Sequence, residues 1–218
     1  ATAGNRKTWT WSGWVKRGNL SVQQRLFTAG TDITGMNQFS VEFAPADAIT
    51  IYSATAAVNI TLTTSQVFRD TSAWYHFVIV FDTTQASASD RYKFYVNDTQ
   101  ITSFASTYTF TLNADYPINN TVLHRIGDAT SGEASAYFDG YLTEVNLIDG
   151  QALTASDFGE TNETTGVWQP AQYTGTYGTN GFYLPMNQTF EGYSVDYLVV
   201  AGGGGGAASG NRGGGGGG

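Results

Sequence analysis

The sequence predicts an all-β protein built as a two-sheet antiparallel sandwich. Three observations carry this prediction. Aromatic residues make up 14% of the 218 residues, threonine is frequent, and only 13% of the residues are charged. Aromatic and β-branched side chains suit the pleated, half-buried surface of a strand. Many short stretches also alternate polar and apolar residues, with Gly, Asn and Asp between them, which is typical of a sandwich or barrel.

The first predicted strand covers TWTWSGWVKRG, residues 8–18. Alternation places Trp9 and Trp11 on one face, as core residues, and Thr10 and Ser12 on the other. Gly13 then interrupts the alternation, so we expect a β-bulge at Gly13 before Trp14.

Further strands are expected along the rest of the chain. The apolar run Phe77–Phe81 predicts a strand that is covered on both faces. Asn97-Asp98 stands where a two-residue hairpin turn requires a positive φ. The remaining expected strands are residues 25–29, 39–44, 49–53, 59–63, 74–82, 91–102, 106–113, 122–128, 136–150, 182–186 and 194–201.

The long stretch 136–150 alternates regularly, so Tyr141, Thr143, Val145 and Leu147 are expected on one face. After it, Thr154-x-x-Asp157 has the spacing of a helix cap and Gly159 that of a stop, which predicts a short helical turn.

Two domains are expected. The sandwich takes residues 1–195, with 160–195 packed on it, and residues 196–218 hold a last strand and the start of a glycine-rich region that continues past Gly218. Glycines 202–206 and 213–218 leave two alternatives. One is a flexible linker; the other, which we favour, is extended polyglycine helices packed side by side.

The net charge of −8 argues against nucleic acid as a partner, and no run of about 18 apolar residues is present to span a membrane. Basic residues nevertheless concentrate near the start of the chain. We interpret them as charges that protect an edge strand, with a small basic binding patch as the alternative. They are Arg6, Lys7, Lys16, Arg17 and Arg25.

The order of these pieces resembles the laminin G-like, concanavalin A-like lectin domain over roughly residues 7–160. The matching motifs are WYHFVIVFD, KFYVND, RIGD and YFDGYLTEVNLIDGQALTASDF. The resemblance implies a jelly-roll sandwich and a packed, structural His76. The continuation to residue 186 and the YLVVAGGGGG tract resemble structural proteins of tailed phages, particularly marine ones.

We expect no enzyme activity. Glycosidases of this fold resemble one another in a Glu-x-Asp-x-x-Glu strand, which places two carboxylates across one sugar bond, and that spacing is missing here. We also expect no cofactor. Calcium is the alternative, since Asp82, Asp90, Asp128, Asp139 and Asp149 lie near strand ends or a loop, but no acidic repeat of the EF-hand kind is present.

The resemblance implies a phage virion protein of a tail fibre, spike or similar extracellular appendage. Its partners would be other virion proteins and host surface glycans, and a homotrimer is expected. The alternatives are a purely structural virion module and a secreted cellular adhesin. Aromatic rings can stack on sugar rings while amides orient them. The candidate ligand-binding residues are therefore Trp168, Tyr173, Tyr177 and Asn180, although each could instead pack its segment onto the sandwich.

Overall fold

In a computed structural model of the protein, the residues described are 2–31, 37–55, 58–128 and 136–186. The glycine tract and the expected strand 194–201 lie outside the described residues. The strands are β1 (Thr8–Arg17), β2 (Gln24–Gly30), β3 (Gln38–Phe43), β4 (Ala48–Thr55), β5 (Val58–Val67), β6 (Tyr75–Asp82), β7 (Tyr92–Val96), β8 (Thr99–Gln100), β9 (Phe104–Ser106), β10 (Leu123–Ile126), β11 (Gly140–Asp149), β12 (Gly159–Thr161), β13 (Trp168–Pro170) and β14 (Phe182–Leu184). Two short 3-10 turns are η1 (Ala88–Asp90) and η2 (Ala155–Asp157).

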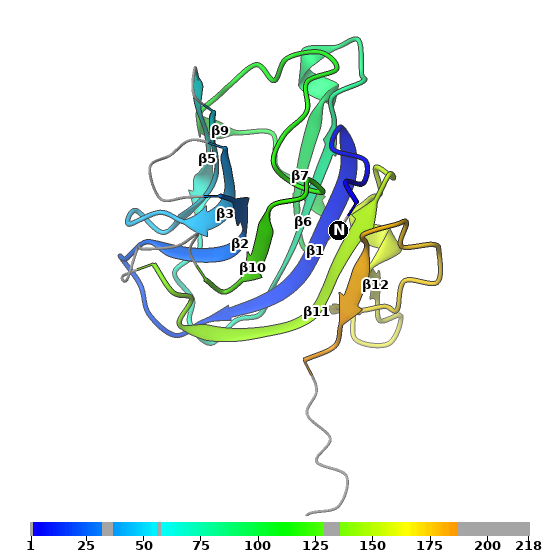
Figure 1. Cartoon of the computed structure of the whole chain (residues 1–218). Coiled ribbons are helices and arrows are strands. Elements are labelled where there is room, and N and C mark those ends of the chain that lie inside the picture. The colour runs from blue at the N-terminus through cyan, green and yellow to red at the C-terminus, as the bar shows by residue number, and fades with distance from the viewer. Residues whose placement is uncertain (1, 32–36, 56–57, 129–135, 187–218) are drawn as a thin grey trace, which may run out of the picture. The chain divides into compact units, whose positions relative to one another are not determined.

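The predicted all-β sandwich is confirmed. The first sheet has the strand order β14-β11-β1-β6-β7-β8 and the second has the order β10-β2-β3-β4-β5-β9. The paired strands in both sheets are antiparallel. The two sheets face each other, and the small β12–β13 pair lies on the side of the first sheet away from the second (Figure 1).

The main core fills the space between the two sheets. Trp9 and Trp11, both fully buried, point into it as predicted. The Trp9 ring stacks on Phe81 with ring centroids 4.7 Å apart, and meets Phe39 of the second sheet edge-on at 5.4 Å. Such aromatic pairs add to the burial of apolar area, so the rings of the first and second sheets hold the sandwich together.

The strand β6 is covered on both faces, as its apolar run predicts. Phe77, Ile79 and Phe81 belong to the main core. Val78 and Val80 point to the opposite, outer face, where they form a second small core with Ile148, Ala155 and Phe158. The residues that cover this outer face come from 150–177, which we call the covering segment.

A β-bulge is present opposite Gly13, as predicted, but the extra residue belongs to β11 and not to β1, so the predicted strand was wrong. The register of β1 with β6 is continuous through Gly13. Against β11, the two steps from Ser12 to Trp14 oppose the three steps from Asn146 to Thr143. The extra residue lies next to Glu144, whose φ is +52°. One extra residue in a strand turns the side chains beyond it to the opposite face of the sheet. Thr143 therefore points outward, while Val145 and Leu147 point into the core. The expectation that all of these share a face was therefore wrong.

The interpretation of the early basic residues as edge protection was wrong for β1 and β2, because neither is an edge strand. Arg17 is 1% exposed and its Nη1 lies 3.0 Å from Oδ1 of Asp47. Arg25 is 3% exposed and its Nε lies 3.2 Å from Glu42. Both cations are therefore internal ion-pair partners, which the charge pattern alone does not reveal.

Three local predictions can also be judged. Asn97 has a φ of +53° at the hairpin turn, as expected. The helical turn after β11 is present as η2, where the Asp157 carboxylate accepts hydrogen bonds from the Thr154 N–H at 2.8 Å and its hydroxyl at 2.9 Å. The strand expected at 106–113 was wrong, because pairing ends at Ser106. Phe110 instead inserts from a loop into the core, fully buried against Phe81, and core aromatics of this kind mimic a strand pattern.

Candidate functional site

A groove lined mainly by aromatic and apolar side chains opens on the outer face of the first sheet. Its volume is about 460 Å³. No charged side chain lines it. We call it the aromatic groove, and its lining residues are Trp14, Trp74, Thr143, Val167, Trp168 and Pro170.

Strands that are distant in sequence supply this lining. Trp14 and Thr143 are register partners on β1 and β11, and the outward facing of Thr143 follows from the bulge at Glu144. Trp74 directly precedes β6 and is 40% exposed. Its ring lies 6.5 Å from that of Tyr141, which is 65% exposed. The exposed aromatic surface therefore continues from the groove onto β11.

A buried histidine holds the Trp168 ring in place. The Trp168 Nε1–H donates to Nδ1 of His76 at 3.0 Å, and the two rings stack at 6.1 Å. His76 also stacks on Trp14 at 4.9 Å. Gly159 permits this position, since a Cβ there would collide with the Trp168 indole. One wall of the groove is thus fixed before any ligand arrives.

The same contact sets the tautomer of His76. An indole N–H can only donate, so Nδ1 accepts and the proton of the neutral ring stays on Nε2. That proton points to Ser12 Oγ, 2.9 Å away. Burial lowers the pKa of His76 to about 3, which keeps the ring neutral. A histidine that donates to a serine cannot take the serine's proton, so the Ser12–His76 pair is structural, in agreement with the packed His76 that the resemblance implies.

The four residues predicted to bind ligand are not brought together. Trp168 lines the aromatic groove. Tyr173 packs on Phe158 at 5.3 Å between ring centroids. Tyr177 meets Tyr173 edge-on at 5.3 Å, and both pack against the second small core. Their packing within the covering segment matches the alternative noted for them, and a ligand-binding role for them stays a prediction.

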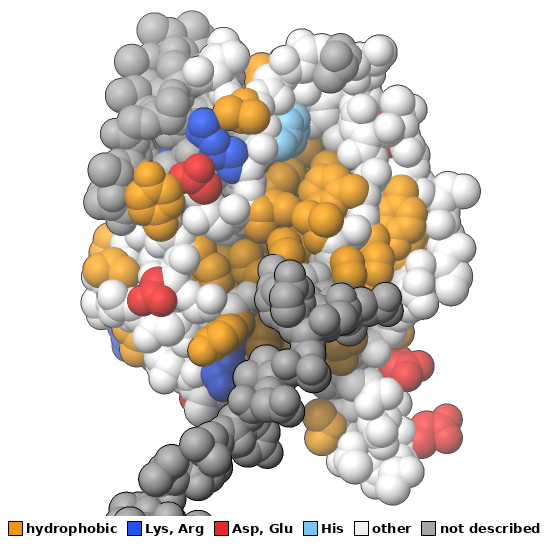
Figure 2. Space-filling model, turned by 60° about the horizontal axis from the view of Figure 1, so that its bottom comes forward, with side chains coloured by type: hydrophobic (Ala, Val, Ile, Leu, Met, Phe, Trp, Pro, Cys, Tyr) orange, Lys and Arg blue, Asp and Glu red, His pale blue; other side chains and the backbone are white. Residues whose placement is uncertain are grey.

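Asn180 lines a separate groove of about 230 Å³ together with Asn119, His124 and Phe182. Its backbone N–H donates to Asp149 at 3.1 Å and its side-chain amide to the Thr2 carbonyl at 3.0 Å. The amide nitrogen is therefore already used within the protein. On the face of the molecule that Figure 2 shows, hydrophobic side chains (orange) gather near the middle.

The described residues contain no group of three or more His, Cys, Asp or Glu side chains placed to hold a metal ion. Asp149, one of the calcium candidates, is 6% exposed and accepts from the N–H groups of Asn5 and Asn180. In the same part of the chain, no helix has the length and apolar character needed to cross a membrane.

Comparison with known proteins agrees with this architecture. A family model described as the concanavalin A-like lectin/glucanases superfamily matches residues 2–158. Among curated proteins, none matches the chain significantly in sequence.

Similar solved structures include CBM40 of the Ruminococcus gnavus IT-sialidase bound to α2,3 sialyllactose, with 15% identity and a TM-score of 0.46 over 62% of this chain and 72% of that one. The heptameric SAP-like pentraxin of Limulus polyphemus has 17% identity and a TM-score of 0.49 over 71% and 69%. The K499G mutant of the NanB sialidase of Streptococcus pneumoniae has 16% identity and a TM-score of 0.49 over 72% of this chain but only 25% of that enzyme. All three TM-scores lie below 0.5, so no conclusion about this chain is drawn from these structures. By the family match over most of its length, the chain belongs to the concanavalin A-like lectin/glucanase superfamily.

Proposed function

We propose that this domain binds carbohydrate without chemical turnover and attaches a phage virion to host surface glycans, as part of a tail fibre, spike or similar appendage. The aromatic groove is the observation that carries the proposal. It offers partly exposed tryptophan rings, one of them fixed by a buried hydrogen bond, and the flat apolar face of a sugar ring stacks on such surfaces. A rigid aromatic wall also lowers the ordering cost of binding.

The chemistry of the buried residues argues against a catalytic Ser12–His76 pair. His76 is the histidine beside this groove, and its tautomer makes it a donor to Ser12. The virion setting and the trimer rest on the resemblance of residues 152–186 and the following tract to phage structural proteins. A trimer would present three copies of the groove and strengthen weak binding through multivalency.

The expected ligand is a neutral glycan. No side chain lining the aromatic groove is charged, so nothing there pairs with a carboxylate or sulfate. The net charge of −8 also repels anionic chains at long range. Neutral oligosaccharides are therefore expected to bind more tightly than sialylated ones such as 3'-sialyllactose. Tighter binding of the sialylated sugar through this groove would contradict the expected ligand class.

Truncating an exposed ring should remove most of the affinity. Trp74→Ala is expected to weaken glycan binding by about 30-fold, since a well-placed aromatic anchor contributes about 2 kcal/mol. Stability should change little, because Trp74 is already 40% exposed. The test displays the full chain on a trimeric scaffold and measures binding to a glycan array and to candidate host cells.

Tyr137→Ala is the matched control, because Tyr137 is an exposed aromatic residue (57%) that does not line the groove. Wild-type affinity in the control and lost affinity in Trp74→Ala would support the proposal. Binding that is equal in all three proteins would move the site elsewhere. No binding to any glycan or cell would favour a purely structural module.

A further inference from the structure

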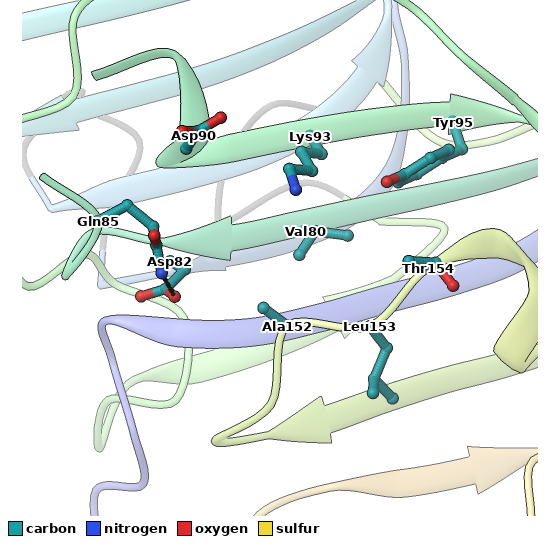
Figure 3. A pocket seen from close by; sticks show the side chains of 9 residues that line it. All are labelled: Val80, Asp82, Gln85, Asp90, Lys93, Tyr95, Ala152, Leu153 and Thr154. Atoms are coloured by element: carbon teal, nitrogen blue, oxygen red, sulfur yellow. Dashed lines mark hydrogen bonds between the residues drawn. The ribbon is translucent and has the colours of Figure 1, made fainter. Parts of the chain in front are cut away.

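A second groove opens on the outer face of the first sheet, beside residues 152–154 of the covering segment. Its volume is about 460 Å³. We call it the polar groove. Val80 lies between residues 152–154 of the covering segment on one side and polar side chains from β6, β7 and the loop between them on the other (Figure 3). The polar groove and the aromatic groove share no lining residue.

One wall of the polar groove is a rigid acceptor unit. The Asp82 carboxylate accepts from the hydroxyls of Thr8 at 3.2 Å and Thr84 at 2.6 Å. Its other oxygen accepts from the Gln85 amide at 2.6 Å (Figure 3). Burial alone would raise the pKa of Asp82, but the hydrogen bonds from Thr84, Gln85 and Thr8 lower it. The Asp82 carboxylate is therefore ionised and fully hydrogen-bonded. Because the Gln85 side chain donates to it through its amide nitrogen, the Gln85 amide oxygen remains free to accept from a ligand.

The polar side chains on the other side of the groove are available to a ligand. The Lys93 ammonium, the Asp90 carboxylate and the Tyr95 hydroxyl line the groove without an ion pair or side-chain hydrogen bond to any residue in the described ranges. Lys93 and Tyr95 lie two positions apart on β7, so they share one face of the strand. Figure 3 shows Lys93 and Tyr95 along one strand, with Asp90 at the left, near the beginning of that strand. Donors and acceptors thus lie beside a half-buried aromatic ring.

This combination selects a class of ligand. The lining carries one positive and two negative side chains, so it does not attract an anion. Sugar hydroxyls both donate and accept, and can bridge an ammonium and a carboxylate at once. The ring of Tyr95 can cover the apolar face of the same sugar. The geometry points to a second saccharide site in the polar groove, formed by Lys93, Asp90, Tyr95 and Gln85 and suited to an uncharged sugar unit.

The inference shares the ligand class of the proposed function but none of its residues, so the two can fail separately. Both grooves lie on the outer face of one sheet, on either side of the packed core of the covering segment. Two sites on one face allow a single domain to hold two branches of a glycan, which raises avidity without new contacts elsewhere.

Site-resolved NMR tests the second site. The full chain is titrated with the methyl glycosides of glucose, galactose, mannose and N-acetylglucosamine. The backbone amides of Lys93, Tyr95 and Leu153 report on the polar groove, and the Trp74 indole N–H reports on the aromatic groove. We expect saturable shifts at the polar groove that Lys93→Ala weakens by at least about tenfold, as for loss of a charged hydrogen-bond donor.

Two variants serve as controls. Asp98→Asn removes a carboxylate from the exposed hairpin turn and should leave the affinity unchanged, whereas Asp90→Asn should lower it. Trp74→Ala should leave the polar-groove shifts unchanged. Shifts at Trp74 alone would overturn the second site while sparing the proposed function. Shifts at the polar groove that survive both Lys93→Ala and Asp90→Asn would also overturn it. If no chemical shift changes at either groove, both the second site and the proposed function would be overturned.

Discussion

Replacing Asp47 with alanine is expected to lower the free energy of unfolding by about 3–5 kcal/mol, because it leaves the buried Arg17 cation without a negatively charged partner. Arg17 is 1% exposed and Asp47 is 2% exposed, with 3.0 Å between Nη1 and Oδ1. The Arg17 guanidinium also donates to the Phe68 carbonyl at 2.7 Å and lies 4.1 Å from the centre of the Phe43 ring. Neither contact can replace the lost carboxylate. Chemical denaturation at neutral pH measures the effect.

Arg69→Ala is the matched control for this prediction. Arg69 contacts the same carboxylate at 3.0 Å, but its side chain is 61% exposed. An exposed ion pair contributes about 1 kcal/mol at most. If Asp47→Ala were no more destabilising than Arg69→Ala, the buried pair would not hold the ends of β1 and the β3–β4 turn together as described.

Acidification should destabilise the domain through His76. Burial holds its folded-state pKa at about 3, against an ordinary value of 6.5. As the pH falls below 6.5, the unfolded chain takes up a proton that the folded protein excludes, so stability decreases until the folded ring also titrates. One pKa unit corresponds to about 1.4 kcal/mol. The expected loss between about pH 6.5 and about pH 4.5 is therefore about 2–3 kcal/mol.

His76→Gln isolates this contribution. A glutamine can accept from the Trp168 indole and donate to Ser12, but it does not titrate. Urea denaturation across the pH range should give a shallower decrease for the variant than for the wild type. His124, whose pKa burial also lowers, is present in both proteins and cancels. Equal pH slopes would contradict a neutral, buried His76.

The strand pattern predicted most of the fold because period-two alternation reports which face of a strand is buried. Trp9, Trp11 and the run Phe77–Phe81 lie where that rule places them. The failures share a physical cause, which is a partner distant in sequence. The bulge at Glu144 depends on pairing with β1, and the burial of Arg17 depends on Asp47. Neither contact can be predicted from the pattern of neighbouring residues in the sequence.

The candidate site was predicted only in part for the same reason. Trp168 was identified from its aromatic character, but its partners Trp14, Trp74 and Thr143 were not. A signal was present for Trp74: it stands two residues before His76, in phase with Val78 and Val80 on the outer face. Thr143 could not be found this way, since the bulge reverses its facing.

The central claim is that a neutral glycan stacks on the aromatic groove. The chain has five tryptophans, so indole N–H resonances followed during titration with neutral methyl glycosides give a test with internal controls. The signals of Trp74 and Trp168 should move saturably, while those of the core residues Trp9 and Trp11 stay fixed. Saturable binding seen at other residues with no movement of Trp74 or Trp168 would contradict the account.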